Sequence, residues 1–431
     1  MTNPEKTKLT TQPPRGTQDI LPGESDQWQQ LESLARNVLK SAGYKEIRLP
    51  MFEQTELFCR TAGEDSDVVG KEMYTFQDKS GRSLTLRPEG TAQAARAYLN
   101  SSMERLRPPT KLFYMGPFFR CEAVQTGRYR QFNQLGLEAF GSASPLLDAE
   151  VIAIACDFLA KAGLAEFEVQ INSIGCASCR PRYREALKLT LQDRLPNLCQ
   201  DCCNRFERNP LRMLDCKVEA DQEQFVDVPT PLDYLCAECE TQWDVLTIAL
   251  RQLKIPFAVN RRLVRGLDYY TRTVFEIVSQ DSRLGAQSTV AAGGRYDNLI
   301  ESLGGPATPA VGWAVGLERL LLLLEKPRAT SVDIFVISTE LDVALRIATI
   351  LRQAGLSVDL DFPTVGSKSR SFTKQLKVAN DLGCQWAVIV GADEIAANEV
   401  SLKCMKTGVQ IRLPQGNLPR YLSKPKQGEL R

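Results

Sequence analysis

The feature that most limits the fold of this chain is a pair of strand-like segments, residues 111–120 and 134–140, joined by a polar loop rich in glycine and arginine. Alternate side chains of a strand point to opposite faces. In the second segment, Gln134, Gly136 and Glu138 therefore share one face, while the intervening apolar residues form the other. The pattern predicts an antiparallel hairpin with one face in a core and one face that carries chemistry.

The polar face of this hairpin suits an anionic ligand. Arg120, at the end of the first segment, carries a planar guanidinium that matches a phosphate group. Gly136 leaves a gap between two polar side chains, and we expect a ligand to use that room. A lone arginine and glutamate would be better explained as a surface salt bridge, so the interpretation depends on the rest of the chain.

Hydrophobic periodicity assigns helices and strands to the first three quarters of the chain. Helices are expected at 26–42, 92–100, 145–162 and 317–325, and strands at 45–52, 84–86, 167–171, 257–259, 273–278, 289–292 and 309–315. A cysteine-rich and mostly helical insertion interrupts this pattern. We therefore expect a mixed α/β (α+β) fold, in which a core occupies 1–172 and 253–327 and the insertion occupies 173–252.

The pattern changes after a linker expected at 326–328. Strand-like and helical segments alternate at 332–337, 342–354, 357–361, 371–382 and 386–391. Such alternation is typical of an α/β domain with a parallel sheet. Residues 331–431 are thus predicted to form a separate domain.

Composition narrows the classes of function. The 431 residues are 43% hydrophobic and 24% charged, with a net charge of +1, which indicates a real core and excludes an overall basic coat for nucleic acid, although not a local basic patch. Histidine is absent, which removes the commonest general base and metal ligand. Residues 1–15 lack a secretory signal, and the longest apolar run, 320–324, is too short for a membrane span. We expect a cytoplasmic protein with no membrane partner and with reduced cysteines.

Four further segments carry polar side chains at turns. Residues 87–91 place a glutamate and a threonine between a strand and a helix, and residues 265–272 place an arginine and two tyrosines before a strand. Residues 292–297 form a glycine turn, which alone is weak evidence. Residues 312–319 let a strand pack closely on a helix, and Arg319 lies in the first turn of that helix, where anions are favoured.

Together these segments resemble the motifs of a known family. The strand ending in Arg120, the loop, the strand bearing Glu138 and the late sequence Gly316-Leu317-Glu318-Arg319 resemble motifs 2 and 3 of class II aminoacyl-tRNA synthetases. Residues 265–271 and 293–297 resemble the two signature segments of histidyl-tRNA synthetases, and 15–19, 208–212 and 215–217 are also similar to that family. The likeness extends from about residue 15 to residue 413. Several separated motifs in one order are more specific than any one of them.

The resemblance implies a class II catalytic core built on an antiparallel sheet, and a histidine–tRNA ligase that uses ATP with Mg²⁺. Such a ligase activates L-histidine as the adenylate and transfers it to the 3′ end of tRNA(His). The implied catalytic residues are Arg120, Arg265 and Arg319, and the implied ATP-binding residues are Arg120, Glu122 and Arg319. The implied histidine-binding residues are Glu89, Gly90, Thr91, Gln134, Glu138, Arg265, Tyr269 and Tyr270, and those near the tRNA acceptor end are Gln125, Arg128 and Arg130.

These implied roles agree with the local chemistry. Glu89 and Gln134 would hold the α-ammonium group of the substrate, while Glu138 and Tyr269 would bracket its imidazole ring. A buried carboxylate that faces a ring N–H discriminates strongly, because a substrate without that group leaves the carboxylate unpaired. No histidine base is needed, since the substrate carboxylate is already ionised and the protein supplies position and positive charge.

The resemblance also bears on partners and on the main alternative. The family is dimeric, with residues 44–56 as the expected interface, and 331–431 resembles an anticodon-binding domain. Its basic residues Lys368, Arg370, Lys374 and Lys377 either face tRNA phosphates or form an ordinary solvated surface. The alternative is a non-catalytic, synthetase-like regulatory subunit of ATP phosphoribosyltransferase in histidine biosynthesis. Such subunits lack the anticodon domain and usually lose signature residues, so the enzyme is favoured.

The cysteines are candidate metal ligands. Three Cys-x-x-Cys pairs stand at Cys176 and Cys179, Cys199 and Cys202, and Cys236 and Cys239. Two such pairs can form a tetrahedral thiolate zinc site. Spacing alone does not show that two pairs meet in space, so reduced structural cysteines are the favoured interpretation over zinc.

Overall fold

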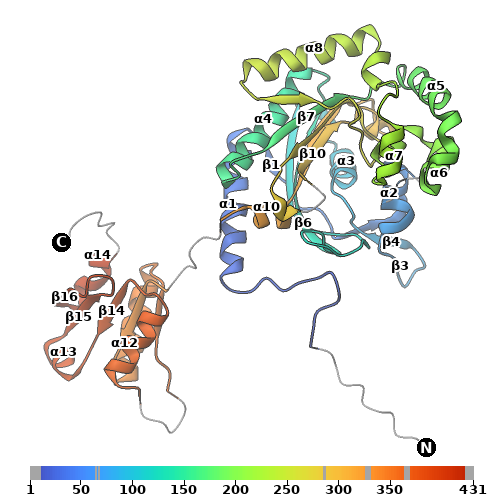
Figure 1. Cartoon of the computed structure of the whole chain (residues 1–431). Helices are drawn as coiled ribbons and strands as arrows, with labels where there is room; N and C mark the ends of the chain where they lie inside the picture. Colours follow the sequence, from blue (N-terminus) through green and yellow to red (C-terminus); the bar gives the residue numbers. More distant parts are fainter. Residues whose placement is uncertain are drawn as a thin grey trace, which may run out of the picture. The chain divides into compact units, whose positions relative to one another are not determined.

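An eight-stranded sheet is the frame of the larger of two units, 1–327 and 328–431, into which the chain divides (Figure 1). This computed structural model describes residues 11–63, 66, 68–284, 288–325, 332–363 and 369–422; the expected linker at 326–328 and Lys368 lie outside these residues. The sheet has the order β1 (Lys45–Glu46), β5 (Thr110–Phe119), β6 (Gln131–Phe140), β11 (Ala310–Gly316), β10 (Thr289–Arg295), β9 (Thr271–Val278), β7 (Glu168–Ser173), β8 (Phe257–Val259). The six central strands are antiparallel, and a parallel pair closes each edge.

The predicted hairpin is confirmed as β5 and β6, the longest paired strands of this sheet. Leu135, Leu137 and Ala139 are fully buried in the main hydrophobic core, on the face that the alternation assigned to them. Burial of a leucine side chain contributes roughly 1.5–3 kcal/mol, so this face anchors the hairpin firmly. The opposite face, with Gln134 and Glu138, is thereby held in one register.

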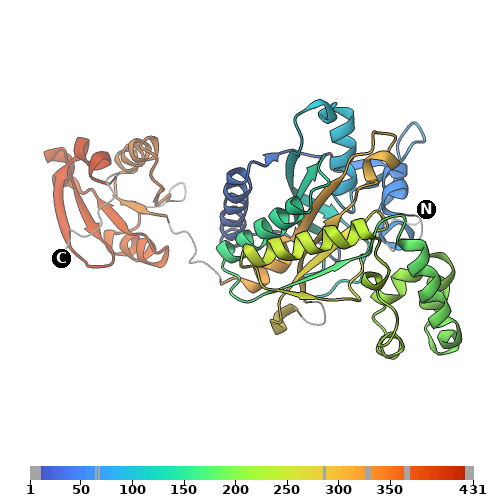
Figure 2. The same cartoon turned by 90° about the horizontal axis from the view of Figure 1, so that it is seen from above.

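Helices cover the apolar face of the sheet. They are α1 (Glu24–Ser41), α4 (Pro145–Ala162), α8 (Ala237–Gln252) and α10 (Leu317–Leu323). Seen from above, α8 runs beside α4 across the sheet (Figure 2). Ser144 caps α4 by accepting a hydrogen bond from the Leu146 N–H at 3.3 Å, and Gly163 ends it in the left-handed conformation, so its predicted limits of 145 and 162 are confirmed.

Smaller elements border the polar face. They are a three-stranded sheet of β2 (Phe52–Gln54), β4 (Ser83–Leu86) and β3 (Thr75–Gln77), with α2 (Thr55–Ala62), η1 (Val68–Glu72), α3 (Thr91–Asn100), η2 (Met103–Arg105) and α9 (Leu299–Ser302). The short η6 (Ser282–Leu284) instead packs against α10 on the apolar face. The single strand predicted at 45–52 is wrong, because β1 joins the large sheet and β2 joins the small one. Pro50 lies between them and has no N–H to donate to a ladder.

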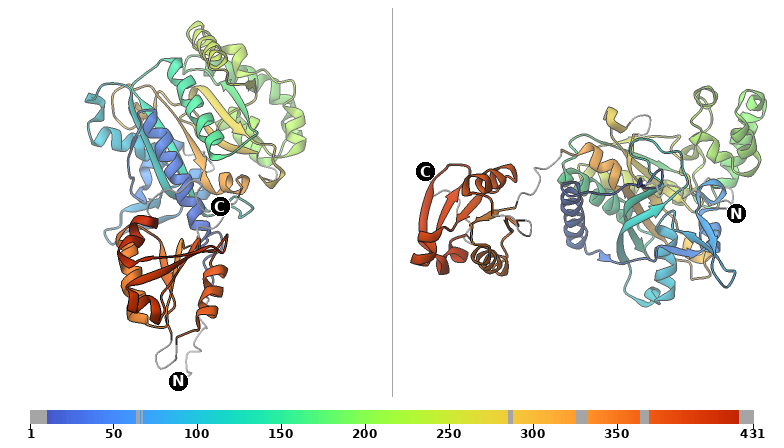
Figure 3. Two further views of the ribbon diagram at one scale, coloured as in Figure 1. Left: turned by 90° about the vertical axis from the view of Figure 1, so that its left-hand side faces the viewer. Right: turned by 90° about the horizontal axis from the view of Figure 1, so that it is seen from below.

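The insertion between β7 and β8 is helical, as expected, and gathers at one end of the first unit (Figure 3). Before α8 it contains α5 (Arg180–Leu191), η3 (Gln192–Asn197), α6 (Gln200–Arg208), η4 (Pro210–Asp215), α7 (Glu219–Gln224) and η5 (Pro231–Tyr234). Its side chains Tyr183, Phe206 and Met213 share a core with the polar side of the sheet. The insertion is therefore packed against the surface that carries the polar residues.

The second unit has a five-stranded sheet in the order β13 (Val358–Leu360), β12 (Ile334–Ile337), β14 (Trp386–Ile389), β15 (Glu399–Cys404), β16 (Gln410–Pro414). The helical elements of this unit are α11 (Leu341–Gln353), α12 (Phe372–Asp381), α13 (Ala392–Ala397), η7 (Gln415–Asn417) and α14 (Leu418–Leu422). The three strands that the alternation predicted form the expected parallel sheet, and two further strands extend it. β13, β12 and β14 are parallel, whereas β15 and β16 form an antiparallel extension, because a tight turn after Cys404 returns the chain directly.

A buried ion pair joins the sheet to α4. Arg295, at the end of β10, is fully buried, and all five of its N–H groups are engaged by Asp148, Asp297 and the carbonyls of Ser142 and Ser144. Thr273 donates a further hydrogen bond of 2.7 Å to Asp148. Residues 292–295, which were expected to begin a glycine turn, instead form the end of strand β10. Arg295 therefore has a structural role at this end of the strand.

We expect Arg295→Met to lower the free energy of unfolding of the first unit by about 3–5 kcal/mol, since Asp148 would remain as an uncompensated buried charge. Lys161→Met provides the control, because Lys161 forms an exposed ion pair with Asp157 and its loss should change stability by less than about 1 kcal/mol. Urea denaturation followed by circular dichroism measures both. Equal stabilities of the two variants would contradict the structural role.

Candidate active site

A cavity of about 490 Å³ opens on the polar face of the large sheet. Of the residues that the sequence had suggested, eleven line it: Glu89, Gly90, Thr91, Arg120, Glu122, Arg128, Gln134, Arg265, Tyr269, Tyr270 and Arg319. They come from the turn before α3, from the β5–β6 hairpin, from the segment before β9 and from α10. Gln125, Arg130 and Glu138 are not among the lining residues of this cavity.

Glu138 lies directly beneath the cavity and is 1% exposed. Its Oε1 accepts hydrogen bonds from Thr91 at 2.8 Å and from Tyr114 at 3.0 Å, and its Oε2 accepts a short one from Tyr296. All three hydroxyl donors line the cavity. A hydroxyl has one hydrogen, so each donor is left with lone pairs alone to offer to a ligand.

Three glycines make room for this arrangement. A Cβ on Gly90 or on Gly136 would lie 2.2 Å from the Tyr114 ring, and a Cβ on Gly312 would lie 2.0 Å from Glu138 Oε2. Tyr114 is the cross-strand partner of Gly136. The expectation that a ligand occupies the gap at Gly136 is therefore wrong, because the Tyr114 ring fills that gap.

Burial dominates the electrostatics of the two central carboxyl groups. It raises the pKa of Glu138 to about 8, against the opposing effect of the hydrogen bonds from Tyr296, Thr91 and Tyr114. Burial also raises the pKa of Glu89, although the N–H groups of Ala92 and Thr91 and the charge of Arg120 act in the other direction. Since Tyr114 also has a raised pKa because of burial, its hydroxyl keeps its proton and remains a donor.

Glu89 caps a helix as well as lining the cavity. Its carboxylate accepts hydrogen bonds from the N–H groups of Thr91 at 2.7 Å and Ala92 at 3.0 Å, in the first turn of α3. A carboxylate at a helix N-terminus satisfies otherwise unpaired donors and is stabilised there. The position of Glu89 is therefore determined by the backbone of α3.

Arginines and carboxylates alternate around the cavity. Glu122 forms ion pairs with Arg120, at 3.6 Å, and with Arg128. Glu276, on β9, pairs with Arg265 and accepts a 2.8 Å hydrogen bond from Thr289. These carboxylates hold the guanidinium groups in place inside the protein.

Arg265 and Arg319 both line the cavity. The Nε of Arg265 is buried and has no hydrogen-bond partner among the described residues. Arg319 donates from Nη1 to the carbonyl of Thr289 at 2.8 Å, and burial, followed by the nearby charge of Arg128, lowers its pKa. Buried cationic groups of this kind favour an anionic ligand such as a phosphate chain.

The expected acceptor-end loop is a tight turn. The backbone groups of Gln125 and Arg128 pair with each other at 2.9 and 3.2 Å. Arg130 donates its backbone N–H to the carbonyl of Gly16 at 2.7 Å, and a Cβ on Gly16 would lie 2.7 Å from the Arg130 side chain. Gly16 has a φ of +88°, which favours glycine. In this structure Arg130 thus anchors the early segment of the chain, and Arg128 is the arginine of the loop that reaches the cavity.

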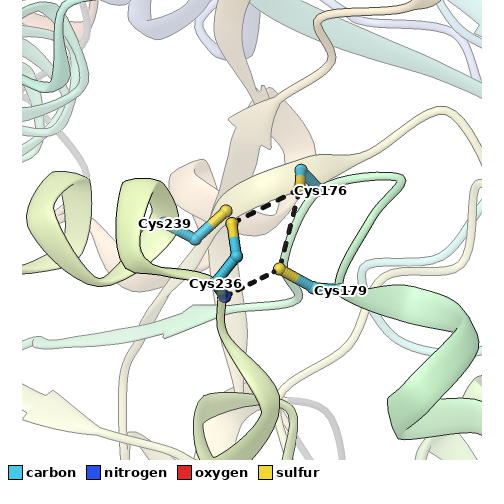
Figure 4. Close-up of side chains that lie close together, drawn as sticks. All are labelled: Cys176, Cys179, Cys236 and Cys239. Carbon is cyan, nitrogen blue, oxygen red and sulfur yellow. Dashed lines mark hydrogen bonds between the residues drawn. The ribbon is translucent and has the colours of Figure 1, made fainter.

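The cysteines converge in two places. The first and third Cys-x-x-Cys pairs meet, with the sulfur atoms of Cys176, Cys179, Cys236 and Cys239 all within 4.8 Å of one another (Figure 4). The second pair, Cys199 and Cys202, meets Cys216 and Asp221 instead. The motif spacing indicated neither of these last two residues as a ligand.

Three residues of the site had no assigned role before the structure: Tyr114, Tyr296 and Glu276. Tyr114 could have been found from the hairpin, because a tyrosine opposite a glycine in an antiparallel pair fills its place. Tyr296 lies in the signature segment 293–297, but the sequence does not indicate that its hydroxyl donates to Glu138. For Glu276, its position on the same face of β9 as Val274 and Val278 gives no signal of a charge pair.

No helix among the residues that the structure describes has the length and apolarity needed to cross a membrane. Both compact units instead enclose hydrophobic cores of their own.

The antiparallel sheet, its arginine-bearing hairpin and the cavity beside them define a class II aminoacyl-tRNA synthetase core. Residues 16–320 match the family described as histidyl-tRNA synthetase, and residues 331–425 match the anticodon binding domain. The chain belongs to the histidyl-tRNA synthetase family.

Individual relatives agree with this assignment. The chain is 47% identical to a histidine–tRNA ligase from Geobacter metallireducens, over 92% of this chain and 95% of the relative. It is 47% identical to a histidine–tRNA ligase from Moorella thermoacetica, over 97% of this chain and 99% of the relative. Apo histidyl-tRNA synthetase of S. aureus is similar in structure, with a TM-score of 0.81 and 35% identity, covering 96% of this chain and 100% of that one.

Glu138 should give the protein a distinctive dependence of stability on pH. Its folded pKa of about 8 exceeds the ordinary value of 4.5, so between these values the folded state holds a proton that the unfolded state releases. Stability from this group therefore falls as pH rises from about 5 to about 8, with a limiting slope of about 1.4 kcal/mol per pH unit. No histidine titrates in this window.

The comparison of Glu138→Gln with the unaltered protein isolates this effect. The difference in melting temperature, unaltered minus variant, should decrease steadily from pH 5 to pH 8 in scanning calorimetry. Glu301→Gln, at an exposed glutamate, serves as the control and should show a constant difference. A constant difference for Glu138→Gln as well would show that its pKa is not raised.

Proposed function

We propose that the chain is a histidine–tRNA ligase that forms histidyl-adenylate from L-histidine and ATP and then transfers the histidyl group to tRNA(His). The observation that carries the proposal is the shared cavity, in which three cationic side chains stand beside a network of oriented hydroxyls. The relatives that bear the name histidine–tRNA ligase support it along nearly the whole chain.

The hydroxyl network is proposed to recognise the imidazole ring. Glu138 takes the single hydrogens of Thr91, Tyr114 and Tyr296, so these oxygens can accept a hydrogen bond from a ring N–H. Tyr269 and Tyr270 supply aromatic walls that are buried. A side chain without the N–H would leave a buried acceptor unpaired, which costs about 1–3 kcal/mol. Glu138 then acts as a positioning residue that contacts the substrate through its partners.

The α-ammonium group of the amino acid is proposed to lie between α3 and the β5–β6 hairpin. Glu89 offers a carboxylate that the first turn of α3 holds in position, and Gln134 offers an amide on the neighbouring strand. Together they suit an α-ammonium group. This places the substrate carboxylate on the side of the cavity where the arginines stand.

The arginines are proposed to bind the triphosphate and to promote adenylate formation. A carboxylate oxygen of histidine attacks the α-phosphorus, the bond from that phosphorus to the bridging oxygen breaks, and diphosphate leaves with the electron pair. Arg120 and Arg265 would stabilise charge at the α-phosphate, and Arg319 would bind the far end of the chain. The place of Arg265 in the lining of the cavity, beside Tyr269 and Tyr270, supports this role.

Magnesium would accompany ATP, since Mg²⁺ prefers one or two carboxylates together with phosphate oxygens. Glu122 and Glu276 fit this need, because both line the cavity and their carboxylates face the arginines of the site. The ion would neutralise part of the charge of the leaving diphosphate.

The tRNA is proposed to contact both units. Arg128, at the mouth of the cavity, suits the phosphates of the acceptor end. Residues 331–425, which match an anticodon binding domain, would bind the anticodon region, and the basic residues Arg370, Lys374 and Lys377 are candidates for phosphate contacts.

Histidine-dependent exchange of labelled diphosphate into ATP tests the enzyme. We expect exchange by the unaltered chain and a reduction of about 10²–10³-fold in Arg265→Gln, because one charge that stabilises the transition state is lost. Arg262→Gln is the matched control, since Arg262 is an exposed arginine of the same segment, and should retain exchange.

Folding and function can be separated in this experiment. The double variant Arg265→Gln with Glu276→Gln leaves no unpaired buried carboxylate, and its exchange should be no higher than that of the single variant. Circular dichroism reports whether each variant is folded. If the folded, unaltered protein shows no exchange with histidine, the proposed ligase activity is contradicted and a regulatory binding protein is favoured.

A homodimer that uses residues 44–56 is part of the proposal. Met51 and Phe52 in this segment are 45% and 51% exposed, and Phe52 stacks edge-on against Phe76, itself 43% exposed. Adjacent exposed apolar side chains are typical of a protein interface.

Phe52→Glu should therefore shift the protein from dimer to monomer in sedimentation velocity experiments, because it would bury an unpaired charge in the interface. Phe362→Glu is the control, since Phe362 is 61% exposed in the other unit and lies outside the segment. A monomeric unaltered protein, or an unchanged dimer in Phe52→Glu, would contradict the expected interface.

A further inference from the structure

Four cysteine sulfurs lie within 4.8 Å of one another where the insertion leaves and rejoins the catalytic sheet. Cys176 and Cys179 follow β7, and Cys236 and Cys239 stand at the start of α8 (Figure 4). The Cys176 sulfur lies 3.6 Å from that of Cys179 and 3.9 Å from that of Cys236. Four thiolates around one zinc ion, at Zn–S distances of about 2.3 Å, would be separated by roughly 3.8 Å.

This spacing distinguishes one ion from other cysteine chemistry. A disulfide requires a sulfur–sulfur distance of about 2.05 Å, which is far shorter than the observed distances. The sulfurs also lie too close together to surround an iron–sulfur cluster, whose inorganic core holds its ligands further apart. The space at the centre fits a single metal ion.

The surroundings of the sulfurs favour thiolates. The backbone N–H of Cys236 donates to the sulfur of Cys179 at 3.1 Å, and the Arg272 guanidinium donates to the sulfur of Cys239 at 3.5 Å. Cys179 and Cys236 each directly precede a helix, α5 and α8, whose N-terminal dipole stabilises negative charge. Four thiolates around Zn²⁺ carry a net charge of −2, which Arg272 partly compensates.

We propose that Cys176, Cys179, Cys236 and Cys239 bind one structural Zn²⁺ ion, and that Cys199, Cys202, Cys216 and Asp221 bind a second. In each site the ion replaces the protons of the cysteine thiols, and no electron is transferred. Zinc is the ion that tetrahedral thiolate sites with closed coordination take most often.

The second site stands on separate observations. Its four ligand atoms lie within 4.8 Å of one another, and three of the four residues are buried. The sulfurs of Cys199 and Cys216 are 3.9 Å apart, and Asp221 approaches Cys216 at 3.2 Å. The N–H groups of Cys202 and Val218 donate to the sulfurs of Cys199 and Cys216 at 3.5 and 3.4 Å, which again favours thiolates.

The two ions would stabilise the segment that carries Tyr269 and Tyr270. Near the first site, Arg272 pairs with Asp297 at 3.2 Å and Arg180 donates a short hydrogen bond to the Tyr270 carbonyl. The second site connects α6, η4 and α7, and η4 carries Arg212, which donates to the Gly266 carbonyl. This consequence for the histidine pocket rests on the proposed function, whereas metal binding does not.

Metal content of the full-length, untagged chain tests the proposal. A polyhistidine tag must be avoided, because the chain itself has no histidine and a tag would add the strongest competing ligands. After dialysis, we expect inductively coupled plasma mass spectrometry to find two zinc ions per chain. Both ions should be released to a chromogenic chelator when a mercurial compound reacts with the thiols. Protein that is folded but contains no zinc, or contains iron instead, would overturn both sites.

Variants assign each ion to its site. Cys236→Ser should contain one zinc ion and Cys216→Ser should contain the other, whereas Cys203→Ser should retain two. Cys203 is the matched control, because it neighbours Cys202 on α6 but directs its sulfur to the carbonyls of Leu195 and Leu198. Two ions in Cys236→Ser would overturn the first site, and two ions in Cys216→Ser would overturn the second.

If the variants do not fold, the unaltered protein still decides the matter. Replacement of zinc by cobalt should give intense visible d–d bands of a tetrahedral thiolate site together with sulfur-to-metal charge transfer. Weak bands of an octahedral ion would contradict thiolate coordination. Neither measurement involves histidine activation, so a failure here is distinct from a failure of the proposed ligase activity.

Discussion

The buried carboxylate of Glu138 is the constraint on which the active site depends. It sits in the middle of the large sheet, and its hydrogen-bond donors come from three separate elements: α3, β5 and the turn after β10. A buried carboxylate without donors would cost several kcal/mol, so the three elements must approach closely. They can do so only because Gly90, Gly136 and Gly312 lack side chains where Tyr114 and Glu138 lie. The same contacts that satisfy one buried carboxyl group therefore shape the floor of the cavity.

A second constraint is the absence of histidine from a chain whose site must handle proton-bearing groups. The site offers positive charge instead: guanidinium groups, each held by a carboxylate or a carbonyl, line the cavity. Nucleotidyl transfer suits such a site, because the nucleophile is already ionised and the barrier falls mainly through positioning and charge stabilisation. Arg265 illustrates the arrangement, since Glu276 fixes its guanidinium at the wall of the cavity.

Local patterns predicted the parts of the fold that local physics determines. The period of two in 134–140 assigned Leu135 to the core and Glu138 to the opposite face, and both assignments hold because a slip of one residue would reverse every side chain. Pairing across the sheet was not predictable in this way. Tyr114 fills the space at Gly136 only because the hairpin register sets them opposite. Likewise, Cys199 and Cys202 meet Cys216 and Asp221 through the tertiary fold of the insertion, which Cys-x-x-Cys spacing does not encode.

The insertion holds the loop before β9 in place beside the catalytic sheet. The loop before β9 has few backbone hydrogen bonds of its own, and Asp268 in it is held by Ala62 of α2 and by Asn209 of the insertion. Arg180 and Arg212, both from the insertion, bind carbonyl groups at Tyr270 and Gly266. Tyrosine walls of a selective pocket must not move, because a loose wall would accept rings of other shapes. Cys176 and Cys236 bring the two ends of the insertion together without lining the cavity. A bond through a shared metal ion would therefore help to fix the tyrosine walls from outside the pocket.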